Sequence, residues 1–150
     1  MSSKYNILVA SLCVIVFIGS CKKSDLPIDE SFTDCENCTY AYQEKGNRII
    51  FSYKKDWQEL QFNVPSGSTR FDYGKDEIIS DKVTYYRAGC PVCRLIPLTP
   101  VDGKIVGKKI TNTKWLVEAE VFLEGPPNLD TRDTITFKQY FTKVYGLTLH

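Results

Sequence analysis

The clearest hydrophobic pattern lies in the last third of the chain, where apolar and polar side chains alternate. Within residues 114–123, every second position is apolar: Trp115, Val117, Ala119, Val121 and Leu123. Glutamates occupy intervening positions. Successive side chains of a β-strand point to opposite faces, so a period of two predicts a half-buried strand. Gly125 and Pro126 follow and are expected to end it.

A second alternating segment covers residues 134–145. Its apolar face carries Ile135, Phe137, Phe141 and Tyr145. Its polar face carries Lys138, Tyr140 and Thr142. A shorter β-branched segment at 104–110 follows the Asp-Gly turn at 102–103, so the last three strands are expected to form an antiparallel meander.

The rest of the chain past residue 34 also resembles strands separated by turn residues. Residues 48–54, 59–64 and 82–88 are rich in β-branched and aromatic side chains, and glycine or proline lies beside each. The region 50–60 is ambiguous, because four of its apolar residues also fit helical spacing: Ile50, Tyr53, Trp57 and Leu60. No other part favours a helix of three turns. The expected fold is all-β, a small antiparallel β-sandwich or partly open barrel with a C-terminal meander.

The N-terminal residues follow a different pattern. Lys4 precedes an uncharged, mostly apolar run at 7–19, which is shorter than the ~20 residues of a membrane-spanning helix but suits a secretory signal. The run ends in Ile18-Gly19-Ser20-Cys21, which resembles the lipobox of bacterial lipoproteins. The resemblance covers only residues 1–21. It implies cleavage before Cys21 and acylation of the Cys21 thiol.

The lipoprotein resemblance sets the expected organisation of the chain. Residues 1–20 are the signal peptide, 21–34 a lipidated polar tether, and 35–150 a single β-rich domain. The expected location is the bacterial cell envelope, with the membrane reached through the lipid anchor. Lys22 after the acylated cysteine resembles the sorting signal for the outer membrane in some bacteria. Cys13 lies inside the signal and is expected to be lost with it.

The charge balance argues against a nucleic-acid partner. The 150-residue chain has 19 basic and 18 acidic side chains, and Lys4 is the only charged residue of the signal. The mature chain is therefore formally neutral. Proteins that bind nucleic acids usually carry an excess of basic residues. We therefore expect no nucleic-acid ligand for this chain.

Four cysteines remain in the mature domain, in two Cys-x-x-Cys pairs: Cys35 with Cys38, and Cys90 with Cys93. Outside the cytoplasm disulfides persist, and three pairings are conceivable. Bonds between the two pairs would close loops of about 55 residues and stabilise the domain by roughly 4 kcal/mol, against about 2 kcal/mol for a bond within one pair. We therefore favour disulfides between the pairs.

Two other interpretations of the cysteines stay open. Cys-Pro-x-Cys resembles half of a zinc ribbon, so four thiolates could hold a structural zinc ion, although the spacing between the pairs is longer than usual. A redox-active pair is the third interpretation. Reactive pairs usually lie at a helix N-terminus, whereas Pro97 and Pro100 follow Cys93 closely. No cofactor is expected unless the zinc alternative holds.

The sequence argues against most catalytic mechanisms. The only histidine, His150, is the last residue, where a side chain is rarely held in place. This removes serine and cysteine mechanisms that need a histidine base. Paired carboxylates, as in glycosidases, remain in a loop (Asp72, Asp76, Glu77) and on one strand (Glu118, Glu120). We interpret both groups as solvated surface and expect no enzyme.

The abundant aromatic residues suggest a binding surface as well as a core. The candidates are Trp57, Tyr85, Tyr86 and Tyr140, with Tyr40 and Tyr42 as further members. Asp133-Thr134-Ile135 resembles the short acceptor of bacterial O-glycosylation at Thr134. The leading hypothesis is a non-catalytic envelope lipoprotein whose β domain binds a protein or glycan. The alternative is an envelope thiol–disulfide or zinc-stapled protein.

Overall fold

The structure is a computed structural model that describes residues 32–87 and 97–145. These residues form β1 (Cys38–Lys45), β2 (Arg48–Lys55), β3 (Gln58–Pro65), β4 (Arg70–Tyr73), α1 (Lys75–Ile78), β5 (Val83–Arg87), β6 (Thr99–Thr111), β7 (Lys114–Glu124) and β8 (Arg132–Lys143). The eight strands belong to one sheet in the order β4-β6-β7-β8-β1-β2-β3-β5. The domain is therefore all-β, as expected.

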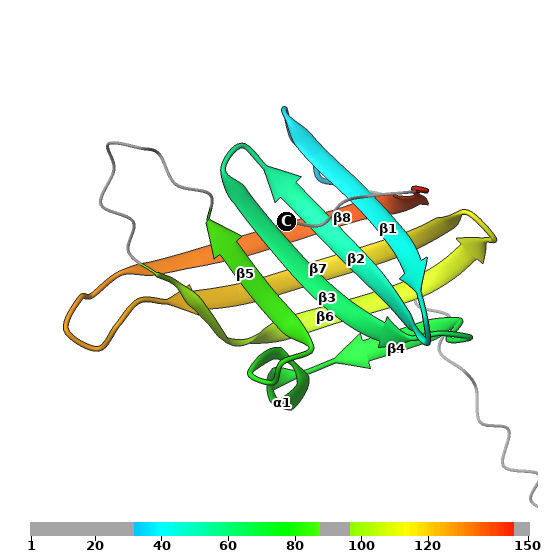
Figure 1. Cartoon of the computed structure of the whole chain (residues 1–150). Helices are drawn as coiled ribbons and strands as arrows, with labels where there is room; N and C mark the ends of the chain where they lie inside the picture. The colour runs from blue at the N-terminus through cyan, green and yellow to red at the C-terminus, as the bar shows by residue number, and fades with distance from the viewer. Residues whose placement is uncertain (1–31, 88–96, 146–150) are drawn as a thin grey trace, which may run out of the picture. The chain divides into compact units, whose positions relative to one another are not determined.

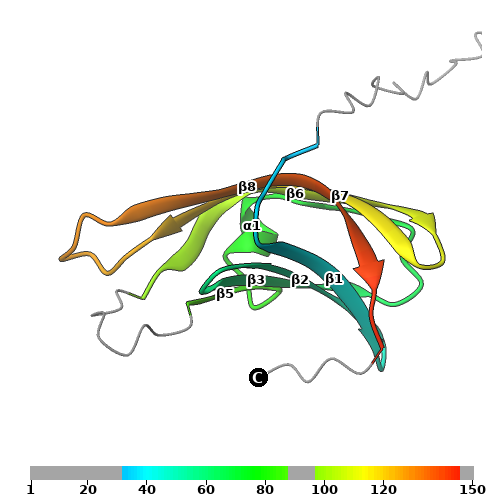
Figure 2. The same ribbon diagram turned by 90° about the horizontal axis from the view of Figure 1, so that it is seen from above.

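The sheet curls into a half-barrel, so that its two halves face each other. Figure 2 shows β1, β2, β3 and β5 as one layer and β6, β7 and β8 as the other. The strands of the two layers cross in Figure 1, and the short α1 lies beside β4. Every neighbouring pair is antiparallel except β1 and β8, which pair in parallel over Ala41–Thr142 and Tyr42–Lys143. The predicted meander is β6-β7-β8.

Most predicted strands are present with small shifts at their ends, but the segment predicted at 104–110 is the second half of a longer strand, β6. The prediction of a turn at Asp102-Gly103 is wrong, because both residues pair with β7 inside β6, beside a shift in register. The ambiguous region 50–60 is the β2–β3 hairpin, and the described residues contain no helix longer than α1. Tyr145 was expected on the buried face, but β8 ends at Lys143 and Tyr145 is 83% exposed. The prediction for Tyr145 is therefore wrong.

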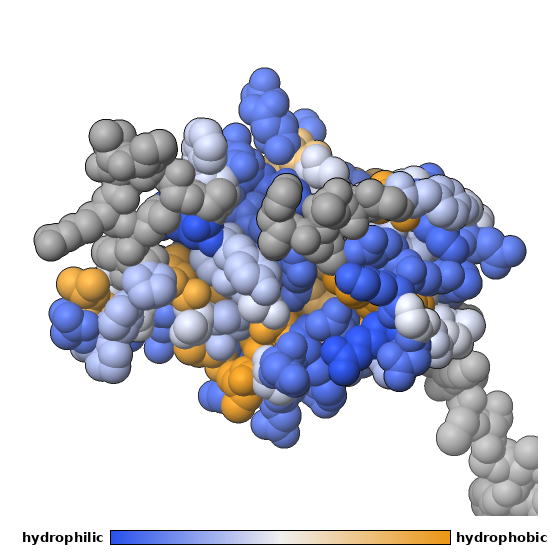
Figure 3. All heavy atoms as spheres, viewed as in Figure 1, coloured by the Kyte–Doolittle hydropathy of each residue, from blue (hydrophilic) through white to orange (hydrophobic). Residues whose placement is uncertain are grey.

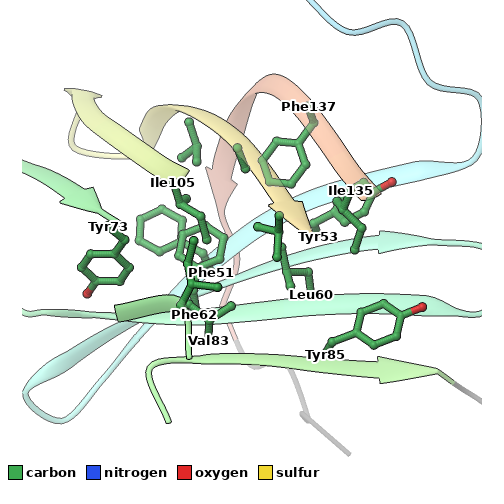
Figure 4. Packing of buried hydrophobic residues seen from close by; sticks show 14 of the residues in the cluster. Phe51, Tyr53, Leu60, Phe62, Tyr73, Val83, Tyr85, Ile105, Ile135 and Phe137 are labelled. Carbon is green, nitrogen blue, oxygen red and sulfur yellow. The ribbon is translucent and has the colours of Figure 1, made fainter. Parts of the chain in front are cut away.

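The core consists of the inward faces of both layers. The largest fully buried side chains are Trp115, Tyr42, Phe51, Phe62, Phe137 and Phe141. Figure 4 shows how Phe51 and Phe62 from one layer meet residues of the other. The alternation read from the sequence of β7 is reproduced position by position in its burial. Burying apolar surface is the main force that holds the two halves of the sheet together.

The outward faces are largely polar. Hydrophilic residues dominate the face in Figure 3, and apolar side chains reach the surface between them. Near α1, Ile79 is 56% exposed. No helix in the described part of the chain combines the length and the apolar character needed to cross a bilayer.

Candidate functional site

The strand register places two rows of side chains across one end of the first layer. Pairing carries the outer row from Cys38 on β1 to Lys55, then to Gln58, and finally to Arg87 on β5. We call these four residues the rim row. Two residues further along each strand, the next row on the same face of the sheet contains Tyr40, Tyr53, Leu60 and Tyr85, which we call the tyrosine row.

A cleft of about 460 Å³ opens beside these rows. One wall comes from the β2–β3 hairpin and the end of β5, and the other from the start of β8. Its lining residues are Tyr53, Lys55, Asp56, Trp57, Gln58, Arg87, Asp133, Thr134, Ile135 and Thr136. Lys55 and Arg87 are basic, and Asp56 and Asp133 are acidic. The cleft is therefore polar and has no formal net charge.

Trp57 stands at the edge of this cleft because of the turn that carries it. Asp56 and Trp57 are the two residues between β2 and β3, and Asp56 has a φ of 49°. Aspartate tolerates this left-handed conformation better than most residues. At a two-residue turn the indole has no strand neighbour to cover it, and Trp57 is 63% exposed. An exposed tryptophan beside polar groups is a typical stacking platform for a ligand.

Behind Trp57, the tyrosine row presents hydroxyl groups. Burial raises the pKa of Tyr53 to about 12, with the negative charges of Asp56 and Asp133 among the further causes. Burial also raises the pKa of Tyr40 and Tyr85. All three phenols are therefore neutral hydrogen-bond donors at physiological pH.

The four aromatic residues proposed from the sequence do not form one surface. Trp57 lines the cleft and Tyr85 lies in the adjacent row, buried. Tyr86 follows Tyr85 on the opposite face of β5 and is 48% exposed. Tyr140 lies under Phe32 and Lys114, with 4.9 Å between the ring centroids and 4.5 Å from the ammonium to the ring. Tyr42 is a core residue whose hydroxyl donates to the Asn112 carbonyl at 3.0 Å.

Thr134 is exposed and lines the cleft. Its backbone N–H donates to Asp133 Oδ1 at 2.8 Å, which fixes the start of β8. The hydroxyl is therefore accessible, and O-glycosylation at Thr134 stays a prediction.

The carboxylates considered for catalysis are separate from the cleft. Asp72 lies 3.8 Å from the Lys104 ammonium, and Glu77 lies 3.9 Å from that of Lys82. Glu77 also accepts from the Gly74 N–H at 3.2 Å. These contacts account for the positions of Asp72 and Glu77 as local surface interactions.

Cys35 and Cys38 form a disulfide within their own Cys-x-x-Cys pair. This differs from the pairing favoured on chain entropy. The physical reason is local: Asn37 has a φ of 61°, and the resulting turn brings the two Cα atoms within 5.6 Å. The Tyr53 hydroxyl lies 3.8 Å from Cys38 Sγ, so the disulfide borders the tyrosine row.

The disulfide also closes a short loop in the segment that runs alongside β8 from Thr33 to Ala41. Thr33, from the end of the expected tether, pairs with β8: its N–H donates to the Lys138 carbonyl at 3.1 Å, and its own carbonyl accepts from Gln139 Nε2 at 2.9 Å. The chain rejoins β8 at Ala41, beside Thr142. The segment from Thr33 to Ala41 is longer than the part of β8 that it accompanies. The turn closed by the disulfide takes up the excess.

Peptide mapping checks this pairing. Tryptic digestion without reductant should release one peptide that contains both Cys35 and Cys38 and is lighter by two hydrogen atoms than its reduced form. Replacing both cysteines with serine should lower the free energy of unfolding by about 2 kcal/mol, because the closed loop is short. Urea denaturation measures this loss.

Bonds between the two pairs would instead link this peptide to the one carrying Cys90 and Cys93. Native alkylation of Cys35 or Cys38 would favour thiol–disulfide exchange. Cys38 begins a strand, so no helix N-terminus is available there to stabilise a thiolate. Cys21, Cys90, Cys93 and His150 lie outside the described residues, and within the described ranges no cluster of three or more metal-ligating side chains occurs.

Sequence reasoning missed most of the cleft. Lys55, Asp56, Gln58, Arg87 and Asp133 are charged or polar residues at strand ends, where such residues are common for structural reasons. The Asp-Trp pair between two alternating strands was the one usable signal, because a large aromatic residue in a tight turn has little chance of being buried.

Comparison with known proteins yields no relative from which a role could be transferred. No family model, no curated protein and no solved structure matches the chain.

Proposed function

We propose that this protein is a lipid-anchored envelope lipoprotein whose β domain binds a glycan without catalysing a reaction. The anchor rests on the sequence from Lys4 to Cys21. Lys22 supports the outer membrane as its location. The disulfide between Cys35 and Cys38 suits a compartment outside the cytoplasm.

The observation that carries glycan binding is Trp57, 63% exposed at the edge of a polar cleft of about 460 Å³. Sugar rings combine an apolar C–H face with many hydroxyl groups. The apolar C–H face can stack on the exposed indole of Trp57. The hydroxyl groups can hydrogen-bond with the carboxylate, amide and threonine groups of the cleft. A protein partner would more typically require a wide apolar patch, whereas the face in Figure 3 is mainly hydrophilic.

Calorimetric titration tests the proposal. Full-length lipoprotein in detergent is titrated with neutral oligosaccharides of glucose, galactose, mannose and N-acetylglucosamine. We expect at least one to bind, and Trp57→Ala to weaken that binding about tenfold through loss of the stacking surface. Because Trp115 is fully buried, a change in tryptophan fluorescence on binding should report on Trp57.

Tyr86→Ala is the matched control, since Tyr86 is a similarly exposed aromatic residue on the opposite face of the sheet. Its affinity should equal that of the wild type. Absence of binding to every oligosaccharide, or an equal loss in both variants, would contradict the proposal.

A further inference from the structure

We propose that the buried hydroxyl of Tyr85, together with that of Tyr53, forms an inner subsite of the cleft that hydrogen-bonds an uncharged oxygen of the ligand. This inference rests on the proposed function and adds the residues that would hydrogen-bond to the sugar. The ligand group would be a hydroxyl or the carbonyl oxygen of an acetamido substituent.

The Tyr85 hydroxyl is one of three buried side-chain groups without a hydrogen-bond partner among the described residues, with the Tyr40 hydroxyl and the Trp115 indole N–H. Tyr85 is only 9% exposed, and its oxygen is buried without a hydrogen-bond partner among the residues that the structure describes. Leaving a buried polar group unsatisfied destabilises a protein by roughly 1–3 kcal/mol. A phenylalanine at this position would pack equally well and avoid that loss, so the hydroxyl needs another reason.

The position of the hydroxyl supplies the reason. In Figure 4 the Tyr85 ring points along β5 toward its carboxyl end, where Arg87 lines the cleft. The charges of Arg87 and Asp133, which both line the cleft, influence the pKa of Tyr85 in opposite directions. Tyr85 and the cleft-lining Tyr53 flank Leu60 in the tyrosine row. The hydroxyl therefore points toward the end of β5 at which the cleft lies, and Tyr85 stands behind the residues that line the cleft.

The electrostatic surroundings select the class of ligand. Two acids, Asp56 and Asp133, oppose an anionic group, while Lys55 and Arg87 oppose a cationic one. The tyrosines stay protonated, so their hydroxyl groups can donate a hydrogen bond to an oxygen atom of the ligand. A neutral sugar unit, stacked on Trp57 with one oxygen directed inward, satisfies each of these conditions.

The test compares stability and binding in one variant. Tyr85→Phe in the full-length lipoprotein should have the wild-type melting temperature or a higher one, while its affinity for the oligosaccharide bound by the wild type falls about tenfold, equivalent to ~1.4 kcal/mol. Tyr42→Phe is the control. It removes a hydroxyl bonded to Asn112, so its melting temperature should fall by about 4 °C with unchanged affinity.

The possible failures are distinguishable. If Trp57→Ala loses binding but Tyr85→Phe keeps wild-type affinity, the inner subsite is disproved and the proposed function stands. A lower melting temperature for Tyr85→Phe with unchanged affinity would assign the hydroxyl a structural role. If the wild type binds none of the oligosaccharides, both proposals fall.

Discussion

Replacing Cys21 with alanine is expected to abolish incorporation of labelled palmitate completely. The thiol of Cys21 is the only acyl acceptor implied by the lipobox resemblance at residues 18–21. Each buried CH₂ group contributes about 0.8 kcal/mol to membrane binding, and stable anchoring takes more than one acyl chain. Because no other acyl acceptor is expected, the loss of palmitate label should be complete. Metabolic labelling followed by immunoprecipitation of the full-length protein measures it.

Membrane release needs a second variant, because the apolar run at 7–19 would itself hold an uncleaved precursor at the membrane. A chain in which a cleavable secretory signal replaces residues 1–21 should be recovered in the soluble fraction of the envelope. Cys13→Ala, within the signal, is the matched control and should label like the wild type. Palmitate on the Cys21→Ala protein would contradict the lipoprotein assignment.

Truncating Phe51 to alanine is expected to cause the largest loss of stability in the domain, about 3–5 kcal/mol. Phe51 is fully buried. It stacks on Phe62 of the neighbouring strand at 4.9 Å, and contacts Trp115 and Phe141 of the opposite layer at 5.3 and 5.6 Å between ring centroids. Removing the ring leaves a cavity between the layers. A domain of this size has a stability of only ~5–15 kcal/mol, so urea denaturation should show a large shift.

Phe122→Ala is the control for this measurement. Phe122 lies on the outward face of β7 and is 40% exposed, so its loss should change stability by less than about 1 kcal/mol. Similar effects of the two substitutions would mean that the layers are not held together at Phe51.

The fold class could be predicted because alternation is a local property. In β7, the sequence period of two and the observed burial agree at each position from Trp115 to Leu123. Periodicity does not identify the partner of a strand. For that reason the parallel pairing of β1 with β8, which joins segments far apart in the chain, had no signal in the sequence. β4 is only four residues long, too short to show a period.

The cleft could not be predicted for a related reason. Its walls come from separate parts of the chain: the β2–β3 turn, the end of β5 and the start of β8. Trp57 was proposed as a binding residue from its type, but its association with Arg87 and Asp133 depends on strand order and register. Local geometry likewise decided the partner of Cys35, because the turn at Asn37 places Cys38 within bonding distance.

The parallel pair of β1 and β8 has a consequence for the order in which the domain would be assembled during the export that we propose. An exported chain emerges N-terminus first, so β1 leaves the membrane before every other strand and β8 leaves last. Among the described strands, β1 and β8 form the one pairing that joins the β1-β2-β3-β5 half of the sheet to the β4-β6-β7-β8 half. The first strand to emerge therefore waits for the last, and the half-barrel closes only after nearly the whole chain has been translocated. Pairings over such long sequence separations fold slowly, so the exposed edge of β1 is the segment that most needs protection during secretion.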